Sequence, residues 1–302
     1  MKFAYCISAY VDSNQLCRLI NSLHDDAHFF IHIDKKADFS AFKQLLVSKS
    51  NVHFVKSYKV KWATISQVEY QMLLLKTACD YPIHFDYIFM LSGFDYPVWS
   101  NKRISQYVKD NYGKEFICAI PINNSKYLHT LQTQIWPDIN IPYSSFLSRA
   151  IRGSSRKLLK LLRICKEDSI SLSQKKLSIY KGSDYFCISQ ALAKYVYEQY
   201  YGNPIYRKHF VNTFAPSETC IHTIVFNSQY SSKCFLIDDE YRGLKQLTLL
   251  HYLKIDGANV RVLSEIDLNE ILSSDKMFAR KFRTGISEEL ISKIENLRKK
   301  HD

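Results

Sequence analysis

The run SSDKMFARKF, residues 273–282, places fixed positive charges near the C-terminus of a chain of 302 residues. No two aspartates stand two positions apart, so the chain lacks the Asp-x-Asp arrangement that holds a divalent metal beside a diphosphate. There is also no Gly-x-Gly, which excludes a dinucleotide fingerprint and a kinase glycine loop, and no glycine loop precedes a Walker-type lysine. A diphosphate leaving group handled by this chain must therefore be balanced by lysine or arginine.

Three carboxylates follow apolar stretches at positions suited to chemistry. Asp34 ends FFIHID, Asp95 follows YIFMLSG, and Glu218 follows Pro216 just before an apolar run. A carboxylate can accept the proton of a reacting hydroxyl. Each also has a structural alternative: Asp34 can cap the next segment, Asp95 can hydrogen-bond its own turn, and Glu218 can be the charge at a helix start. For Glu218 the two roles are compatible, because a helix start holds the carboxylate in place.

Strand-like and helix-like stretches alternate in the first third of the chain. Expected strands cover residues 3–11, 29–34, 52–58 and 87–93, and expected helices cover 15–23, 39–48 and 67–80. Such alternation predicts an α/β fold with a mainly parallel central sheet flanked by helices. Ligands of such sheets bind at the carboxyl ends of the strands, so the segments to search are 8–14, 32–36, 58–66 and 92–97.

Five stretches, in this order, resemble the core-2/I-branching β-1,6-N-acetylglucosaminyltransferase family, which includes the peptide O-xylosyltransferases. They are FAYCISAYVDSNQLCRLINSLHDDAHFFIHIDKKAD, KVKWATISQVEYQMLLLKTA, YIFMLSGFDYPVWS, KGSDYFCIS with FAPSETCIHTIVFNS, and FARKF. The third is similar to a specific Leu-Ser-Gly-x-Asp-x-Pro signature. The resemblance implies one GT-A-type glycosyltransferase domain over 1–302, with a nucleotide-binding half (1–115) and an acceptor-binding and catalytic half (116–302).

The resemblance also implies a donor site for a UDP-sugar. Asp34 matches an aspartate that contacts uracil, and Asp95 falls close to the sugar. Trp62 falls near the uridine, although a tryptophan before an amphipathic helix is otherwise usually a core residue. Lys281 matches the lysine that lies against the diphosphate and does the work of a metal.

A second cation of the family lies upstream of this lysine. The spacing leaves both Lys254 and Arg261 as candidates for it. The resemblance therefore implies no metal and no cofactor beyond the UDP-sugar donor.

The acceptor side and the catalytic base are implied by the fourth stretch. Gly182 and Ser183 match an element that supports the acceptor region, and Glu218 falls on the catalytic base. The chain departs from the family at Ser217, where aspartate is usual, and at Tyr10, where many members have histidine.

Composition limits the partners and the compartment. The formal net charge of +12 indicates an anionic partner, and a nucleotide sugar, an anionic membrane and nucleic acid all qualify. No nucleic-acid-binding module is present, so no nucleic acid is expected.

The eight cysteines form no CxxC pair, which favours reduced, buried thiols. No apolar segment approaches the roughly 20 residues of a membrane span. Eukaryotic members of the family are typically anchored by an N-terminal span, so we expect a bacterial, cytoplasmic enzyme.

The segment LSRAIRGSSRKLLKLLRIC, residues 147–165, is basic and amphipathic. Its basic residues recur at spacings of three and four and share one helical face: Arg149, Arg152, Arg156, Lys160 and Arg163. Either this is a solvated face, or it holds the protein peripherally against the inner face of an anionic membrane that presents a lipid-linked acceptor.

The sequence thus predicts a metal-independent, inverting glycosyltransferase of surface polysaccharide biosynthesis. We expect it to move N-acetylglucosamine from a UDP-sugar to a glycan hydroxyl. Transfer from UDP-xylose is the alternative within the same class. A glycan-binding protein without turnover is the alternative from another class, but it would need neither the base Glu218 nor the cation Lys281.

Overall fold

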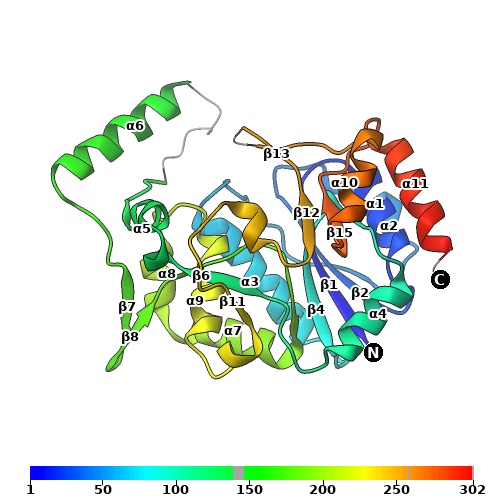
Figure 1. Ribbon diagram of the computed structural model, residues 1–302, viewed down its shortest axis with the longest axis horizontal. Coiled ribbons are helices and arrows are strands. Elements are labelled where there is room, and N and C mark those ends of the chain that lie inside the picture. The colour runs from blue at the N-terminus through cyan, green and yellow to red at the C-terminus, as the bar shows by residue number, and fades with distance from the viewer. Residues whose placement is uncertain (139–145, 258, 301–302) are drawn as a thin grey trace.

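The computed structural model describes residues 1–138, 146–257 and 259–300, with the side chains of 146–149 and 160 excepted. Its central sheet has the strand order β10-β4-β1-β2-β3 (Figure 1). Four strands run parallel, namely β1 (Phe3–Ala9), β2 (His28–Ile33), β3 (Val52–Phe54) and β4 (Tyr87–Ser92), and β10 (Phe186–Ser189) is antiparallel to β4. The predicted α/β fold with a mainly parallel central sheet is confirmed.

Helices cover both faces of this sheet because its strands are apolar on both sides. Along β1, Phe3, Tyr5 and Ile7 join one core cluster, whereas Ala4 and Cys6 join the other. The first cluster packs against α1 (Ser13–Ser22), α2 (Phe39–Leu46), α4 (Asn101–Asp110), α10 (Leu268–Ser273) and α11 (Glu288–Lys299). The second packs against α3 (Ile65–Cys79), α5 (Lys126–Thr133), α7 (Gln190–Gly202), α8 (Pro204–Phe210) and α9 (Cys220–Phe226). Burying each large apolar side chain contributes roughly 1.5–3 kcal/mol.

A second, three-stranded sheet joins the first third of the chain to the last. It has the order β12-β15-β5, where β12 (His251–Leu253) runs parallel and β5 (Asp95–Pro97) antiparallel to β15 (Phe278–Arg280). The register places Arg280 opposite Asp95. Residues far apart in the sequence therefore meet beside the carboxyl ends of the central strands.

The remaining strands form small units around this framework. A third sheet has the order β11 (Phe235–Leu236), β6 (Cys118–Pro121) and β9 (Tyr180–Lys181). Two hairpins are formed by β7 (Ser169–Leu172) with β8 (Lys175–Ser178), and by β13 (Ile255–Asp256) with β14 (Asn259–Val260). The helix α6 (Phe146–Leu161) extends away from the body of the molecule (Figure 1).

The eight cysteines are free thiols. The prediction that they are buried holds for Cys6, Cys118, Cys187 and Cys220, whereas Cys165 is exposed and the other three are half-buried. Burial raises the pKa of the Cys118 thiol to about 11, which keeps it protonated and unreactive at neutral pH. Within the described ranges, no helix combines the length and the apolar composition that crossing a bilayer requires.

Candidate active site

A cavity of about 510 Å³ lies at the carboxyl ends of β1, β2 and β4. Five of the predicted site residues line it: Asp34, Trp62, Ser183, Glu218 and Lys281. The other four predicted residues, Asp95, Gly182, Lys254 and Arg261, are not part of its wall. The structure thus brings together side chains from both ends of the chain, at the place where parallel sheets bind ligands.

Asp34 and Trp62 form the wall next to β2. The carboxylate of Asp34 accepts the backbone N–H of Lys36 at 2.9 Å and lies 3.3 Å from that residue's ammonium group. Asp34 therefore stabilises its own turn and also faces the cavity. Trp62 is 59% exposed and lines the cavity, so the structural alternative, a core residue, does not hold. Its ring lies 5.7 Å from the ring of Phe214.

Glu218 ends a short 3₁₀ turn, Pro216–Glu218, that leads into α9. Its carbonyl accepts the N–H of Gly182 at 2.8 Å, and its carboxylate accepts a hydrogen bond from the ammonium of Lys181. A Cβ atom at Gly182 would lie 2.1 Å from the ring of His222. Glycine is thus required where the chain passes behind Glu218, and Gly182 supports the carboxylate from outside the cavity.

Two charged residues beside Glu218 were not predicted. Lys181 is buried, and burial lowers the pKa of its ammonium to about 8, which the nearby carboxylate of Asp184 partly offsets. Asp184 lines the cavity, accepts a hydrogen bond from the amide of Gln71 at 3.2 Å, and has its pKa raised by burial. Both lie inside KGSDYFCIS, but the resemblance assigned roles only to Gly182 and Ser183 of that stretch.

The cationic wall consists of Lys281 and Arg280, and sequence reasoning missed Arg280. Burial, followed by the charges of Arg280 and Arg283, lowers the pKa of the Lys281 ammonium. Arg280 is 7% exposed, and its guanidinium lies 4.4 Å from the ring centre of Tyr185. Its Nη1 atom has no hydrogen-bond partner within the described part of the chain. Positive charge is therefore concentrated at this wall, where an anion would neutralise it.

Asp95 lies behind the cationic wall and is fully buried. Its carboxylate accepts the N–H of Ser92 at 2.8 Å, so Asp95 hydrogen-bonds its own turn, which was the structural alternative for this residue. It also lies 3.2 Å from Nε2 of His251 and 3.6 Å from Nε of Arg280. Asp95 thus orients Arg280 and does not face the space available to a sugar.

Lys254 and Arg261 are engaged elsewhere. Lys254 contacts Asp267 at 3.0 Å and Glu270 at 2.6 Å, and Arg261 also binds Asp267, which is fully buried. The two cations flank the β13–β14 hairpin and fix its base to the segment before α10. The structure does not bring either of them into the cavity. The cations that line it are Lys281, Arg280 and Lys36, and Lys36 is paired with Asp34. Among the described residues, no group of three or more His, Cys, Asp or Glu side chains is placed to hold a metal ion.

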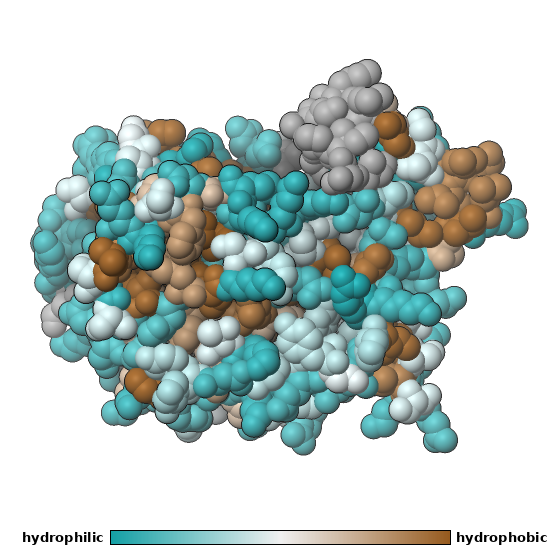
Figure 2. All heavy atoms as spheres, turned by 180° about the vertical axis from the view of Figure 1, so that it is seen from behind, coloured by the Kyte–Doolittle hydropathy of each residue, from teal (hydrophilic) through white to brown (hydrophobic). Residues whose placement is uncertain are grey.

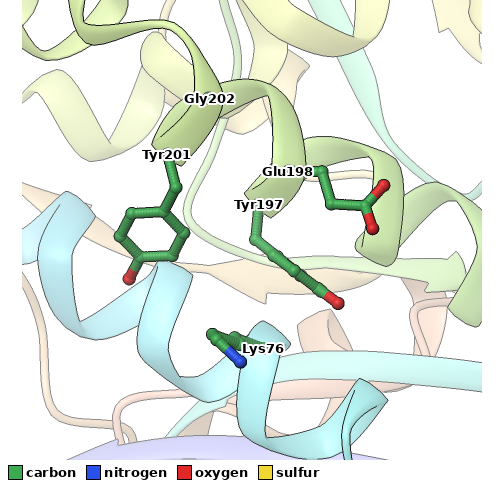
Figure 3. Close-up of a pocket in the computed structure, with 5 residues that line it drawn as sticks. All are labelled: Lys76, Tyr197, Glu198, Tyr201 and Gly202. Carbon is green, nitrogen blue, oxygen red and sulfur yellow. The ribbon is translucent and has the colours of Figure 1, made fainter.

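A second hollow of about 600 Å³ lies between α3 and α7 (Figure 3). Tyr197 and Tyr201 extend from α7 toward Lys76 on α3, whereas Glu198 points away. Lys76 pairs with Asp80, and its ammonium lies 5.7 Å from the ring centre of Tyr197. The charged groups of this hollow are thus paired along their own helices, Lys76 with Asp80 at the end of α3 and Glu198 with Lys194 on α7, and we take the cavity at the strand ends as the candidate active site.

Two buried histidines next to this cavity remain neutral. The N–H of Tyr58 donates to Nε2 of His32 at 2.9 Å, which places the ring proton on Nδ1, and the His32 ring stacks on Tyr70 at 4.9 Å. Burial lowers the pKa of His32 to about 4. Burial, reinforced by the charge of Lys181, lowers the pKa of His222 to about 3.

These histidines make the folded state sensitive to acid. Their folded pKa values lie below the unfolded value of about 6.5, so their contribution to stability is complete above that pH and is lost as the pH falls. We expect each to cost about 2 kcal/mol of unfolding free energy at about pH 5. Urea denaturation at about pH 7 and pH 5 measures this. The pKa of Asp184 is raised, so its protonation in acid acts on stability in the opposite direction. The contribution of His32 is therefore taken as the difference between the wild type and His32→Gln in the unfolding free energy lost from about pH 7 to about pH 5. Equal losses in both proteins would contradict the prediction.

Comparison with known proteins identifies the family. Residues 3–238 match the model of the family described as Branch: Core-2/I-Branching enzyme, so the chain belongs to this family of glycosyltransferases. It is 22% identical over 309 residues to Xylosyltransferase sqv-6 of Caenorhabditis briggsae, covering 94% of this chain and 35% of that protein. It is also 22% identical over 298 residues to human Xylosyltransferase 2, covering 92% of this chain and 31% of the relative. The chain spans about a third of the length of these relatives.

Solved structures show a more distant likeness. Mouse Xyloside xylosyltransferase 1, in its apo form, aligns with a TM-score of 0.36 and 10% identity, covering 79% of this chain and 86% of that one. The 4-diphosphocytidyl-2C-methyl-D-erythritol synthase of Anaerococcus prevotii aligns with a TM-score of 0.38 and 14% identity, covering 80% and 88%.

Proposed function

We propose that this protein is an inverting glycosyltransferase that moves a sugar from a UDP-sugar to a glycan hydroxyl. The observation that carries the proposal is a cavity lined by the carboxylates of Asp34, Asp184 and Glu218 and, on its cationic wall, by Lys281 and Arg280. In this scheme Glu218 accepts the proton of the acceptor hydroxyl while that oxygen attacks the anomeric carbon from the face opposite the diphosphate. The ion pair with Lys181 keeps the carboxylate in position.

The leaving diphosphate is stabilised by Lys281 and Arg280 in this proposal. Fixed cations in a partly buried site act strongly on developing negative charge, because they are already oriented before the reaction. Asp34 and Trp62 hold the base and ribose of the donor, and Ser183 lies on the acceptor side. Residues 1–115 then supply most of the contacts to the nucleoside, and residues 116–302 supply the base, the cations and the acceptor surface.

Two sugars are candidates for the group that is transferred. We propose N-acetylglucosamine as the transferred sugar, in keeping with the core-2/I-branching family, for the assembly of a surface polysaccharide on a lipid-linked oligosaccharide. Xylose is the second candidate, because the relatives described above are named xylosyltransferases.

A donor screen tests the proposal. The protein is incubated with UDP-N-acetylglucosamine, UDP-xylose and other UDP-sugars, and UDP release and thermal protection are measured for each. We expect one UDP-sugar to raise the melting temperature and to release UDP slowly by transfer to water. If glycans protect the protein against thermal unfolding and no donor releases UDP, the result would favour a glycan-binding protein. If neither glycans nor UDP-sugars bind, both functions are contradicted.

A further inference from the structure

The helix α6 carries an apolar surface that the described chain does not cover. Its members are Ile151, Leu158 and Leu161 on the helix and, just beyond it, Leu162 and Ile164, and we call them the α6 patch. Leu158 is 56% exposed and Leu161 is 80% exposed. We call α6 and the residues directly after it the arm. Figure 2, which views the molecule from behind, shows hydrophobic residues gathered at the outer end of the arm, on the right. A cluster of exposed aliphatic side chains on a projecting element marks an interaction surface.

The basic face of the same helix is turned toward the body. Arg152 is buried, and the guanidinium of Arg156 lies 4.1 Å from the ring centre of Trp136. The basic face was expected either to be solvated or to meet lipid. Arg152 fits neither alternative because it is buried, and Arg156 packs on Trp136. Arg163 is exposed. The remaining members of that face, Arg149 and Lys160, have side chains outside the described residues.

A chain of aromatic contacts connects the arm to the cavity. Below Arg156, the ring of Trp136 lies 4.5 Å from Phe214, and Phe214 lies 5.7 Å from Trp62, which lines the cavity. These rings fix where α6 stands relative to the candidate active site. The α6 patch is therefore connected to the wall of the cavity through a short series of side-chain contacts.

We propose that the α6 patch lies in the interface of an anionic membrane and thereby presents a lipid-linked acceptor to the cavity. Charge identifies the occupant: the protein carries a net charge of +12, and exposed cations adjoin the patch at Lys157 and Arg163. Interfacial helices place an apolar side at the headgroup boundary while lysine and arginine reach the phosphates. A second copy of this chain would bring the same positive charges to the same place, which opposes pairing of two patches.

Vesicle sedimentation tests the apolar part of the proposal. The protein is mixed with vesicles of phosphatidylcholine alone or with added phosphatidylglycerol. We expect the wild type to bind to the anionic vesicles. We expect the affinity of the triple variant Leu158→Gln, Leu161→Gln, Leu162→Gln for these vesicles to be lower by about 30-fold or more. The matched control is Val47→Gln, Ile266→Gln, Ile286→Gln, which removes three exposed aliphatic side chains elsewhere and should bind as the wild type does. Undiminished binding of the α6 variant, or no binding of the wild type to either vesicle, overturns the proposal.

A charge variant tests the choice of lipid. Lys157→Glu with Arg163→Glu should lower binding to anionic vesicles by about 10-fold or more, and equal binding of the wild type to both vesicle types overturns the anionic assignment. Light scattering covers self-association: a dimer that disappears in the α6 triple variant, without vesicle binding, assigns the patch to a second copy instead. The lipid-linked acceptor rests on the proposed function, but sedimentation needs no turnover. UDP release in solution should be equal in the wild type and the α6 triple variant, so failure of the enzyme and failure of the arm are distinguishable.

Discussion

Replacing Glu218 with glutamine is expected to lower turnover by about 10²-fold or more while UDP affinity stays near that of the wild type. Glutamine keeps the size of the side chain and can still accept the hydrogen bond of Lys181, but it cannot take up a proton. Turnover is measured as acceptor-dependent UDP release, and affinity by titration calorimetry with UDP. Activity within a few-fold of the wild type would remove Glu218 from the mechanism.

Asp184 provides the matched control for this experiment. Asp184 is a second carboxylate of the same wall, one that was not predicted from the sequence, and its pKa is raised by burial. If Glu218 is the base, Asp184→Asn should cost less turnover than Glu218→Gln. The reverse order would transfer the role of base to Asp184. Thermal unfolding of both variants separates loss of chemistry from loss of fold, because Asp184 also holds Gln71.

Removing the ammonium of Lys281 is expected to weaken UDP binding by about 10- to 100-fold and to slow transfer at the same time. The charge faces the cavity beside Arg280, so its loss acts both on the bound donor and on the departing diphosphate. Lys281→Arg should restore part of the activity, because arginine keeps the charge but not the compact shape of the ammonium. Calorimetry with UDP and steady-state kinetics measure both effects.

Lys254→Ala is the control for the cation, because Lys254 is bound to Asp267 and does not line the cavity. This variant should keep UDP affinity within a few-fold of the wild type. A larger loss of UDP affinity than in Lys281→Ala would make Lys254 a diphosphate-binding cation after all. The same proposal expects turnover to survive excess EDTA. Loss of activity in EDTA with recovery on adding manganese would contradict a leaving group balanced by protein cations alone.

The sequence predicted the central sheet well because the elements that build it are local. Apolar runs such as FAYCISA and YIFMLS are fully buried strands, and the long helix after Trp62 appeared where its periodicity placed it. The small sheet β12-β15-β5 was less accessible to prediction. Its strands are three residues long, and β15 pairs with β5 from the first third of the chain, so no local pattern indicates which strand lies beside which.

The same distinction explains the site. Asp34, Glu218 and Lys281 belong to recognisable motifs, and the structure places all three on one cavity. Arg280 was missed although it adjoins Lys281, because its direction is set by pairing with Asp95 across β15 and β5. The orientation of α6 was also beyond the sequence. Helical periodicity separates an apolar from a basic face, but only the contact of Arg156 with Trp136 shows which one faces the body.

Biosynthesis of the chain reaches β15 last among the described strands, and the cationic wall forms only when that strand pairs with β5. Contacts between such distant segments close late in folding, since the entropy of the intervening loop must be offset first. A nascent chain that has emerged as far as β10 can assemble the central sheet but still lacks Arg280 and Lys281. The proposed donor is therefore captured only by a finished molecule, and its binding then stabilises the last pairing to be made.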